Sequence, residues 1–143
     1  MKKVLAIGNA LVDVLVRLES DELLSKLNLP KGSMQLIEKE KVSELNKVIE
    51  GLKTSLASGG SAANTIHGLA KLGIPSAYVG KIGDDEYGTL FQNDMIKNGI
   101  RAKLKSTKTP TGIATAFISP DSERTFATYL GAAVELCEKD ITP

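Results

Sequence analysis

The sequence contains one cysteine, no clear excess of charge of either sign and no long hydrophobic run. The single Cys137 cannot form an internal disulfide, which fits a reducing compartment. Lys and Arg number 18 against 17 for Asp and Glu, so no basic surplus is available for a nucleic acid or an anionic membrane. No window approaches the roughly 18 to 20 apolar residues that span a bilayer. We therefore expect a cytoplasmic protein that binds neither nucleic acid nor membranes.

The amino-terminal segment MKKVLAIGNALVDVLV has two lysines and an apolar run, as a signal peptide does. Asn9 and Asp13 interrupt the run and no small-residue cleavage site follows, so we interpret the segment as a buried first strand. The length of 143 residues and the hydrophobic content of 42% suit one globular core. The chain has no internal repeat, low-complexity tract or obvious linker.

Strand and helix patterns alternate through the first two thirds of the chain. Apolar spacing predicts, in order, a strand at 4–7, a strand at 12–16, a helix at 21–27, a helix at 38–52, a strand at 54–58, a helix at 60–72, a strand at 77–82 and a helix at 85–97. This alternation predicts an α/β fold of the doubly wound, Rossmann-like kind, with a mostly parallel sheet covered on both faces.

The final third of the chain has a different pattern. The runs at 111–118 and 123–130 flank the turn signal Pro120-Asp121-Ser122 and predict a β-hairpin. The last four residues, Asp140-Ile141-Thr142-Pro143, place a capping residue before a proline, which is the arrangement that opens a helix. We therefore expect the chain to be truncated at this end.

The segment GGSAANTIHGLAKLG, from Gly59 to Gly73, places two adjacent glycines directly before a helix. The glycines remove side chains from this spot, and the helix start leaves N–H groups unpaired. Asn64 lies one turn further on, on the side that a helical wheel turns away from the core, as does His67. Phosphate-loop and dinucleotide spacings of glycine are absent. The segment is a candidate site for a polyhydroxy ligand; the alternative is an ordinary turn with Ser61 as helix cap.

A second candidate segment, Gly8-Asn9-Ala10-Leu11-Val12-Asp13, follows the first predicted strand. Open α/β sheets bind ligands at the carboxyl ends of their strands, and an Asn with an Asp suits vicinal hydroxyls. Asn-Asp turns are also common without any ligand.

Two other sets of polar residues have simpler explanations. Asp84 and Asp85 precede a predicted helix and are interpreted as helix caps rather than metal ligands. His67 and Ser61 share a helix face, but no orienting carboxylate is evident, which argues against nucleophilic catalysis.

Together, these segments resemble the first signature of the ribokinase-like, or PfkB, family of carbohydrate and nucleoside kinases. The resemblance rests on GGSAANTIHGLAKLG and on GKIGDDEYG at 80–88, and it extends over essentially the whole chain. The adenosine-kinase-like branch is the most similar, through GNxxxD at the start, GSMQLIE at 32–38 and PTG at 110–112. The resemblance implies a ribokinase-like fold with a small β lid, built from elements around 10–36 and 101–130.

The resemblance also implies a pocket for a nucleoside or a sugar, with adenosine favoured over ribose or fructose. Asp13 and Asn64 would bind the hydroxyls, and Arg124 in the lid would contact the transferred phosphate unless it is simply solvated. The remaining pocket residues would be Asn9, Leu11, Gln35, Gly59, Gly60, Ser61, Ala114 and Phe126.

Residues 1–143 resemble only the amino-terminal, substrate-binding part of such a kinase. The family's second signature, a glycine-rich anion hole with the aspartate that takes the hydroxyl proton, has no counterpart here, nor does the segment associated with magnesium. ATP and Mg²⁺ are thus expected for the complete enzyme, with their binding elements and the catalytic base outside this chain. The alternative is a non-catalytic nucleoside- or sugar-binding module. The sequence makes no prediction about the oligomeric state.

Overall fold

A computed structural model describes residues 3–141, which fall into two compact units. Unit 1 comprises the chain up to Val12, Ala57–Gly112 and the chain from Leu130 onward. Unit 2 comprises Asp13–Leu56 and Ile113–Tyr129. Thr142 and Pro143, on which the predicted carboxyl-terminal helix start depends, lie outside the described residues. Within the described part of the chain, no helix has the length and apolar character needed to cross a membrane.

Unit 1 is built on a parallel sheet of three strands in the order β1-β5-β6. These strands are β1 (Val4–Ile7), β5 (Ser76–Gly83) and β6 (Arg101–Thr107), and two helices, α3 (Ser61–Lys71) and α4 (Glu86–Lys97), connect to them. Two short 3-10 helices, η1 (Gly131–Glu135) and η2 (Glu138–Asp140), follow.

Strand β6 corrects the predicted lid, which included residues from 101 onward. Residues 101–107 instead pair with β5 in the parallel sheet, with Ala77 opposite Arg101 and Gly83 opposite Thr107. The segment RAKLKST has a weak strand pattern because Arg or Lys occupies positions 101, 103 and 105. Such charged alternation suits a strand at the edge of a sheet.

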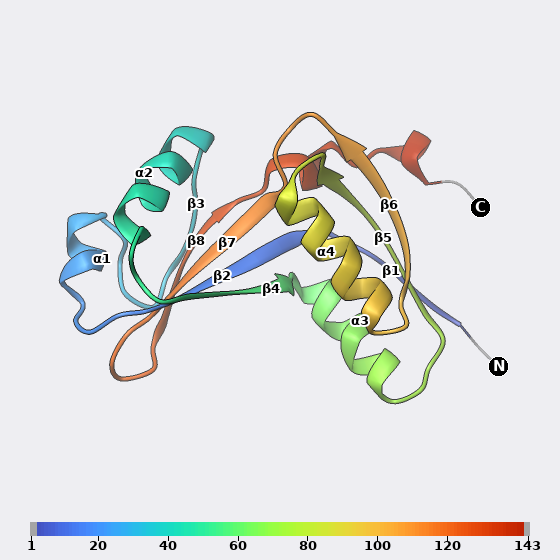
Figure 1. Cartoon of the computed structure of the whole chain (residues 1–143), viewed down its shortest axis with the longest axis horizontal. Coiled ribbons are helices and arrows are strands. Elements are labelled where there is room, and N and C mark those ends of the chain that lie inside the picture. Colours follow the sequence, from blue (N-terminus) through green and yellow to red (C-terminus); the bar gives the residue numbers. More distant parts are fainter. Residues whose placement is uncertain (1–2, 142–143) are drawn as a thin grey trace. The chain divides into compact units, whose positions relative to one another are not determined.

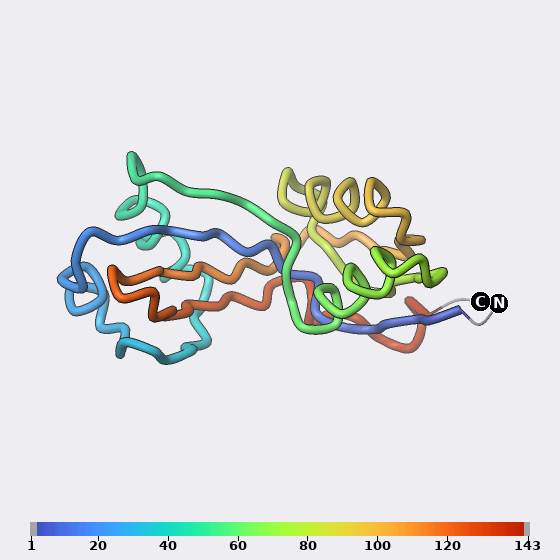
Figure 2. Tube along the Cα trace, turned by 90° about the horizontal axis from the view of Figure 1, so that it is seen from below, coloured from blue at the N-terminus to red at the C-terminus, as the bar shows by residue number. Residues whose placement is uncertain are grey.

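Both α-helices of unit 1 cover the same face of the three-stranded sheet (Figures 1 and 2). Buried Ala63 and Ile66 of α3 and Phe91 and Met95 of α4 belong to one core cluster with Tyr78 of β5. Side chains on the other face of β1 remain open, and those of Leu5 and Ile7 are 55% and 50% exposed. Among the described residues, α-helices therefore cover one face of this sheet.

Unit 2 contains most of a five-stranded sheet in the order β3-β8-β7-β2-β4 (Figure 1). The strands are β2 (Leu11–Arg17), β3 (Met34–Leu36), β4 (Thr54–Gly59), β7 (Gly112–Ile118) and β8 (Arg124–Tyr129). Two helices, α1 (Glu22–Lys26) and α2 (Lys39–Ile49), belong to the same unit. The antiparallel β7–β8 pair confirms the predicted hairpin, whereas β3, which pairs in parallel with β8, was not predicted.

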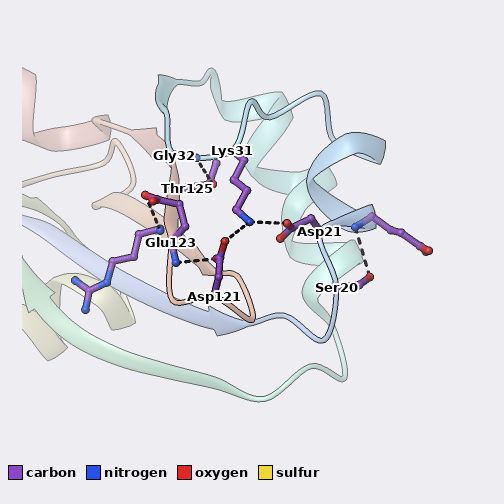
Figure 3. Close-up of polar contacts among 9 residues, drawn as sticks. Ser20, Asp21, Lys31, Gly32, Asp121, Glu123 and Thr125 are labelled. Atoms are coloured by element: carbon purple, nitrogen blue, oxygen red, sulfur yellow. Dashed lines mark hydrogen bonds and ion pairs between the residues drawn. The ribbon is translucent and has the colours of Figure 1, made fainter.

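A charged cluster ties the tip of this hairpin to the loop before β3 (Figure 3). The Lys31 ammonium donates to Asp21 Oδ2 at 2.7 Å and to Asp121 Oδ2 at 2.6 Å. The backbone N–H of Gly32 donates to Thr125 Oγ1 at 3.0 Å, which joins the loop to β8. Hydrogen bonds from Lys31 lower the pKa of both aspartates, and those to the aspartates raise the pKa of Lys31.

A second cluster joins the start of α4 to the segment before β7. Asp85 accepts hydrogen bonds from Gly88 N at 2.8 Å, from Thr111 N at 2.8 Å and from Thr111 Oγ1 at 2.6 Å. Burial raises the pKa of Asp85, but these hydrogen bonds outweigh that effect and lower it below its usual value. The interpretation of Asp85 as a helix cap is thereby confirmed.

Glycine at position 88 is required by close backbone packing. A Cβ atom on Gly88 would overlap the carbonyl oxygen of Gly83, and neither backbone segment has a flexible end that can move aside. We expect Gly88→Ala to lower the free energy of unfolding by about 3 kcal/mol, measured by urea denaturation. Gly68→Ala is the matched control, because Gly68 also lies within a helix but has open space around it. That variant should gain up to about 1 kcal/mol from helix propensity. Equal effects of the two substitutions would contradict the packing argument.

Candidate functional site

In unit 1 the turn after β1 packs directly against the start of α3. A Cβ atom on Gly60 would lie 2.7 Å from the carbonyl oxygen of Asn9, and one on Gly8 would lie 2.7 Å from Ala62 Cβ. Gly60 also has φ +95°, in the region that favours glycine. The structure thus brings Gly8 and Asn9 of one candidate segment against Gly60 and Ala62 of the other.

The start of α3 presents backbone donors beside exposed amide side chains. Gly60 is the N-cap residue and has no side chain to cap the helix, so Ser61 is the first helical residue and not the cap. The side chains of Asn9, Ser61 and Asn64 are exposed, while Gly59 is buried. Uncapped N–H groups donate, and the two amides both donate and accept. We call Asn9, Gly60, Ser61 and Asn64 the turn group; its chemistry suits a ligand rich in hydroxyls.

Leu11 has a packing role in unit 1. Its side chain is 9% exposed, and a Cβ atom on Gly112 would overlap its Cδ2 atom. Leu11 therefore fills space against the Gly112 backbone, and its predicted role as a pocket-lining residue receives no support from its burial.

In unit 2, strand register places several predicted lid residues on one face of the sheet. Ala116 pairs with Phe126 and Ala114 with Thr128, so Ala114, Phe126 and Arg124 share a face. Phe126 is partly buried and Arg124 is exposed. We call this side of the sheet the lid face.

Asp13 of β2 lies close enough to Arg124 for the two charges to interact. Burial raises the pKa of the Asp13 carboxyl, and the positive charge of Arg124 opposes part of that shift. The carboxylate is half-buried, and Arg124 offsets only part of the effect of burial on it. It is therefore available to accept hydrogen bonds from ligand hydroxyls. Arg124 in turn supplies a cation that suits a phosphate.

The same register separates Gln35 from these residues. Gln35 pairs with Ala127, whereas its neighbours Met34 and Leu36 pair with Phe126 and Thr128 and so belong to the lid face. Met34 and Leu36 are 61% and 64% exposed. The sequence analysis chose the polar residue of this short strand and missed the two apolar ones; their period-two spacing was the available signal.

His67 has a carboxylate partner that the sequence analysis did not find. Its Nε2 atom lies 3.0 Å from Ser58 Oγ and 3.6 Å from Asp94 Oδ2, and Ser58 rather than Ser61 is the serine in contact with it. In a nucleophilic triad, serine and carboxylate contact different ring nitrogens, whereas here both contact Nε2. The arrangement therefore does not build a nucleophilic serine.

Solved structures of kinases share this fold. The adenosine kinase from Sinorhizobium meliloti aligns with a TM-score of 0.85 and 38% identity, over 98% of this chain and 42% of that one. A probable sugar kinase from Rhizobium etli CFN 42 aligns with a TM-score of 0.86 and 37% identity, over 97% of this chain and 42% of that one. The fold is therefore the α/β fold of ribokinase-like kinases, with a mostly parallel sheet.

The model of the pfkB family of carbohydrate kinases matches residues 30–141, and the chain belongs to that family. Among curated relatives, a probable fructokinase-5 from Arabidopsis thaliana is 35% identical over 59% of this chain and 26% of its own length. The ribokinase of Bacillus subtilis (strain 168) is 32% identical over 78% of this chain and 37% of its own length. The chain thus spans well under half the length of these relatives.

The contact between Gly60 and Asn9 is testable by a paired substitution. Gly60→Ala introduces both backbone strain and a clash with the Asn9 carbonyl, so we expect a loss of about 2–3 kcal/mol in unfolding free energy. Gly73→Ala is the control, because Gly73 has φ +76° but nothing within 4 Å of an added Cβ, and its expected loss is about 1 kcal/mol. Amide chemical shifts should move at Asn9 in the first variant only. A loss in Gly60→Ala no larger than in the control would show that the contact is unimportant.

Proposed function

We propose that the complete protein transfers a phosphoryl group from ATP to a hydroxyl of a nucleoside or sugar, and that this chain supplies the substrate-binding part. The observation that carries the proposal is the close packing of Gly60 against Asn9, which gathers amide side chains and uncapped N–H groups in one place. Membership of a family of kinases supplies the reaction class.

The turn group binds substrate hydroxyls. The amides of Asn9 and Asn64 each offer a donor and an acceptor, which matches a hydroxyl group that needs both. With no side chain on Gly60, a sugar ring approaches the backbone closely. These residues hold and orient the substrate, and in phosphoryl transfer such positioning supplies much of the rate enhancement.

Unit 2 supplies a carboxylate, a guanidinium and apolar contacts. Asp13 accepts hydrogen bonds from hydroxyls, and Arg124 contacts the phosphoryl group in transfer. The exposed side chains of Met34 and Leu36, beside Phe126, suit an apolar planar group such as a nucleobase. A free sugar offers them no such group, so a nucleoside, with adenosine first, is the favoured substrate.

The complete enzyme uses ATP with Mg²⁺. ATP supplies the phosphoryl group, and Mg²⁺ supplies positive charge that neutralises the charge on the phosphates. Among residues 3–141, no three His, Cys, Asp or Glu side chains are grouped in a way that would hold a metal ion. We propose that the elements that bind ATP and Mg²⁺, and the base that takes the hydroxyl proton, belong to the part of the complete enzyme that this chain does not span.

A phosphotransfer screen on the complete reading frame tests the reaction. With adenosine, ribose and fructose as acceptors and ATP as donor, we expect turnover to be fastest with adenosine. Turnover with ribose or fructose but not with adenosine would support the kinase reaction and overturn the preference for a nucleoside. Binding of adenosine without any turnover would favour a non-catalytic binding module.

Asp13→Asn should weaken ligand binding without loss of stability. Loss of a charged acceptor lowers adenosine affinity by about 10–100-fold, as measured by calorimetry. Because burial raises the pKa of Asp13, its ionisation disfavours folding at pH 7, and the asparagine variant should be at least as stable there. This advantage should vanish below about pH 3.9, where the carboxyl is protonated in the unfolded chain as well.

Asp84→Asn is the control, since it removes the same charge from an exposed side chain of unit 1. Its adenosine affinity should equal that of the unsubstituted protein. If Asp13→Asn binds adenosine equally well, Asp13 is not a ligand-binding residue.

A further inference from the structure

We propose that Ser58, His67 and Asp94 form a hydrogen-bonded cluster that positions the glycine turn for ligand binding. The proposal rests on the proposed function of the turn group and adds positioning residues that do not themselves touch the substrate. All three residues belong to unit 1, and they come from β4, α3 and α4.

The cluster is compact and largely shielded from solvent. Ser58 is 7% exposed, and the side chains of His67 and Asp94 are 15% and 36% exposed. The Ser58 hydroxyl donates to Asp94 Oδ2, and its oxygen lies 3.0 Å from His67 Nε2. Asn98, at the end of α4, donates to Asp94 Oδ1 at 3.1 Å and so fixes the carboxylate from its other side.

These contacts determine which ring nitrogen of His67 carries a proton. Ser58 uses its single hydroxyl proton in the hydrogen bond to Asp94. Toward the imidazole, Ser58 Oγ can therefore only accept a hydrogen bond. His67 Nε2 must therefore be protonated and act as the donor. The same N–H points toward a carboxylate 3.6 Å away, which favours this tautomer further.

Ser58 precedes the glycine pair directly, which is why its anchoring matters. Gly59 and Gly60 have no side chains through which the rest of the protein can hold them, and glycine has the largest conformational freedom of any residue. The Ser58 hydroxyl is bonded to two helices at once, so the end of β4 is held immediately before the turn. A ligand then meets a turn that is already ordered, and less ordering entropy opposes binding.

The His67 ring is an NMR reporter for the cluster, and its signals are assigned by their loss in His67→Gln. Long-range ¹H–¹⁵N spectra should show a proton on Nε2. Addition of adenosine should shift both ring nitrogen signals, because a cluster that positions the ligand site must respond when the site is filled. A proton found on Nδ1 instead, or signals unmoved at saturating adenosine, would overturn the proposal.

Paired substitutions separate positioning from simple stability. His67→Ala removes the donor to Ser58, and we expect adenosine affinity to fall about tenfold, the effect of one hydrogen bond of about 1.4 kcal/mol. His67→Gln retains a side-chain N–H donor and should keep affinity within about threefold of the original.

Asp94→Ala and Asp94→Asn form a second such pair, because the asparagine oxygen still accepts from Ser58. Lys71→Ala, on an exposed site one turn further along α3, is the control and should not change affinity.

The outcomes distinguish this proposal from the proposed function. If the unsubstituted protein binds neither adenosine nor fructose, both fall. If it binds adenosine but His67→Ala and Asp94→Ala bind equally well, only the positioning role falls. Should an alanine variant fail to fold, the ring signals of the unsubstituted protein still decide the matter, since a purely structural cluster predicts no response to adenosine.

Discussion

The arrangement of the turn group in unit 1 depends on one steric constraint, the close approach of the Asn9 carbonyl to Gly60. Any side chain at position 60 would push the turn after β1 away from the start of α3. The same tight packing continues inward, because Gly8 and Gly80 leave the space that the buried ring of Tyr78 occupies. Tyr78 in turn packs against Phe91 of α4, and the centroids of the two rings are 5.5 Å apart. The exposed turn is therefore an extension of the core, and close packing helps to set its geometry.

Some motif residues have a clear structural role within unit 1. GKIGDDEYG and PTG carry much of the family resemblance, yet their best-defined contacts are internal: Asp85 caps α4 and binds Thr111. Thr111 also accepts from Gly83 N at 2.9 Å, so the two motifs form one packed unit. Their role is to fix the end of β5 relative to the segment that enters β7. A motif is thus evidence of family membership without each of its residues being a site residue.

Much of the fold was predictable because its elements carry clear local patterns. The apolar spacing of α2, the glycine and proline stops after α3 and the turn signal of the β7–β8 hairpin each appear in the structure. β6 and β3 were missed because one alternates charged residues and the other has only three residues, so neither shows an apolar run. Pairing Asn9 with Gly60 was within reach of sequence reasoning. The contact of His67 with Asp94 was not, since it depends on how two helices pack on one sheet.

The order of strands along the chain has a consequence for synthesis. β1 pairs with β5, so Val4 has no strand partner until Ser76 has been made. Unit 2 is interrupted in the same way, because β8 at Arg124–Tyr129 lies between β3 and β7 in its sheet. Such long-range pairings slow folding and leave apolar strands exposed on the ribosome. Leu5 and Ile7 are therefore available to a chaperone early in translation, well before the sheet to which they belong can form.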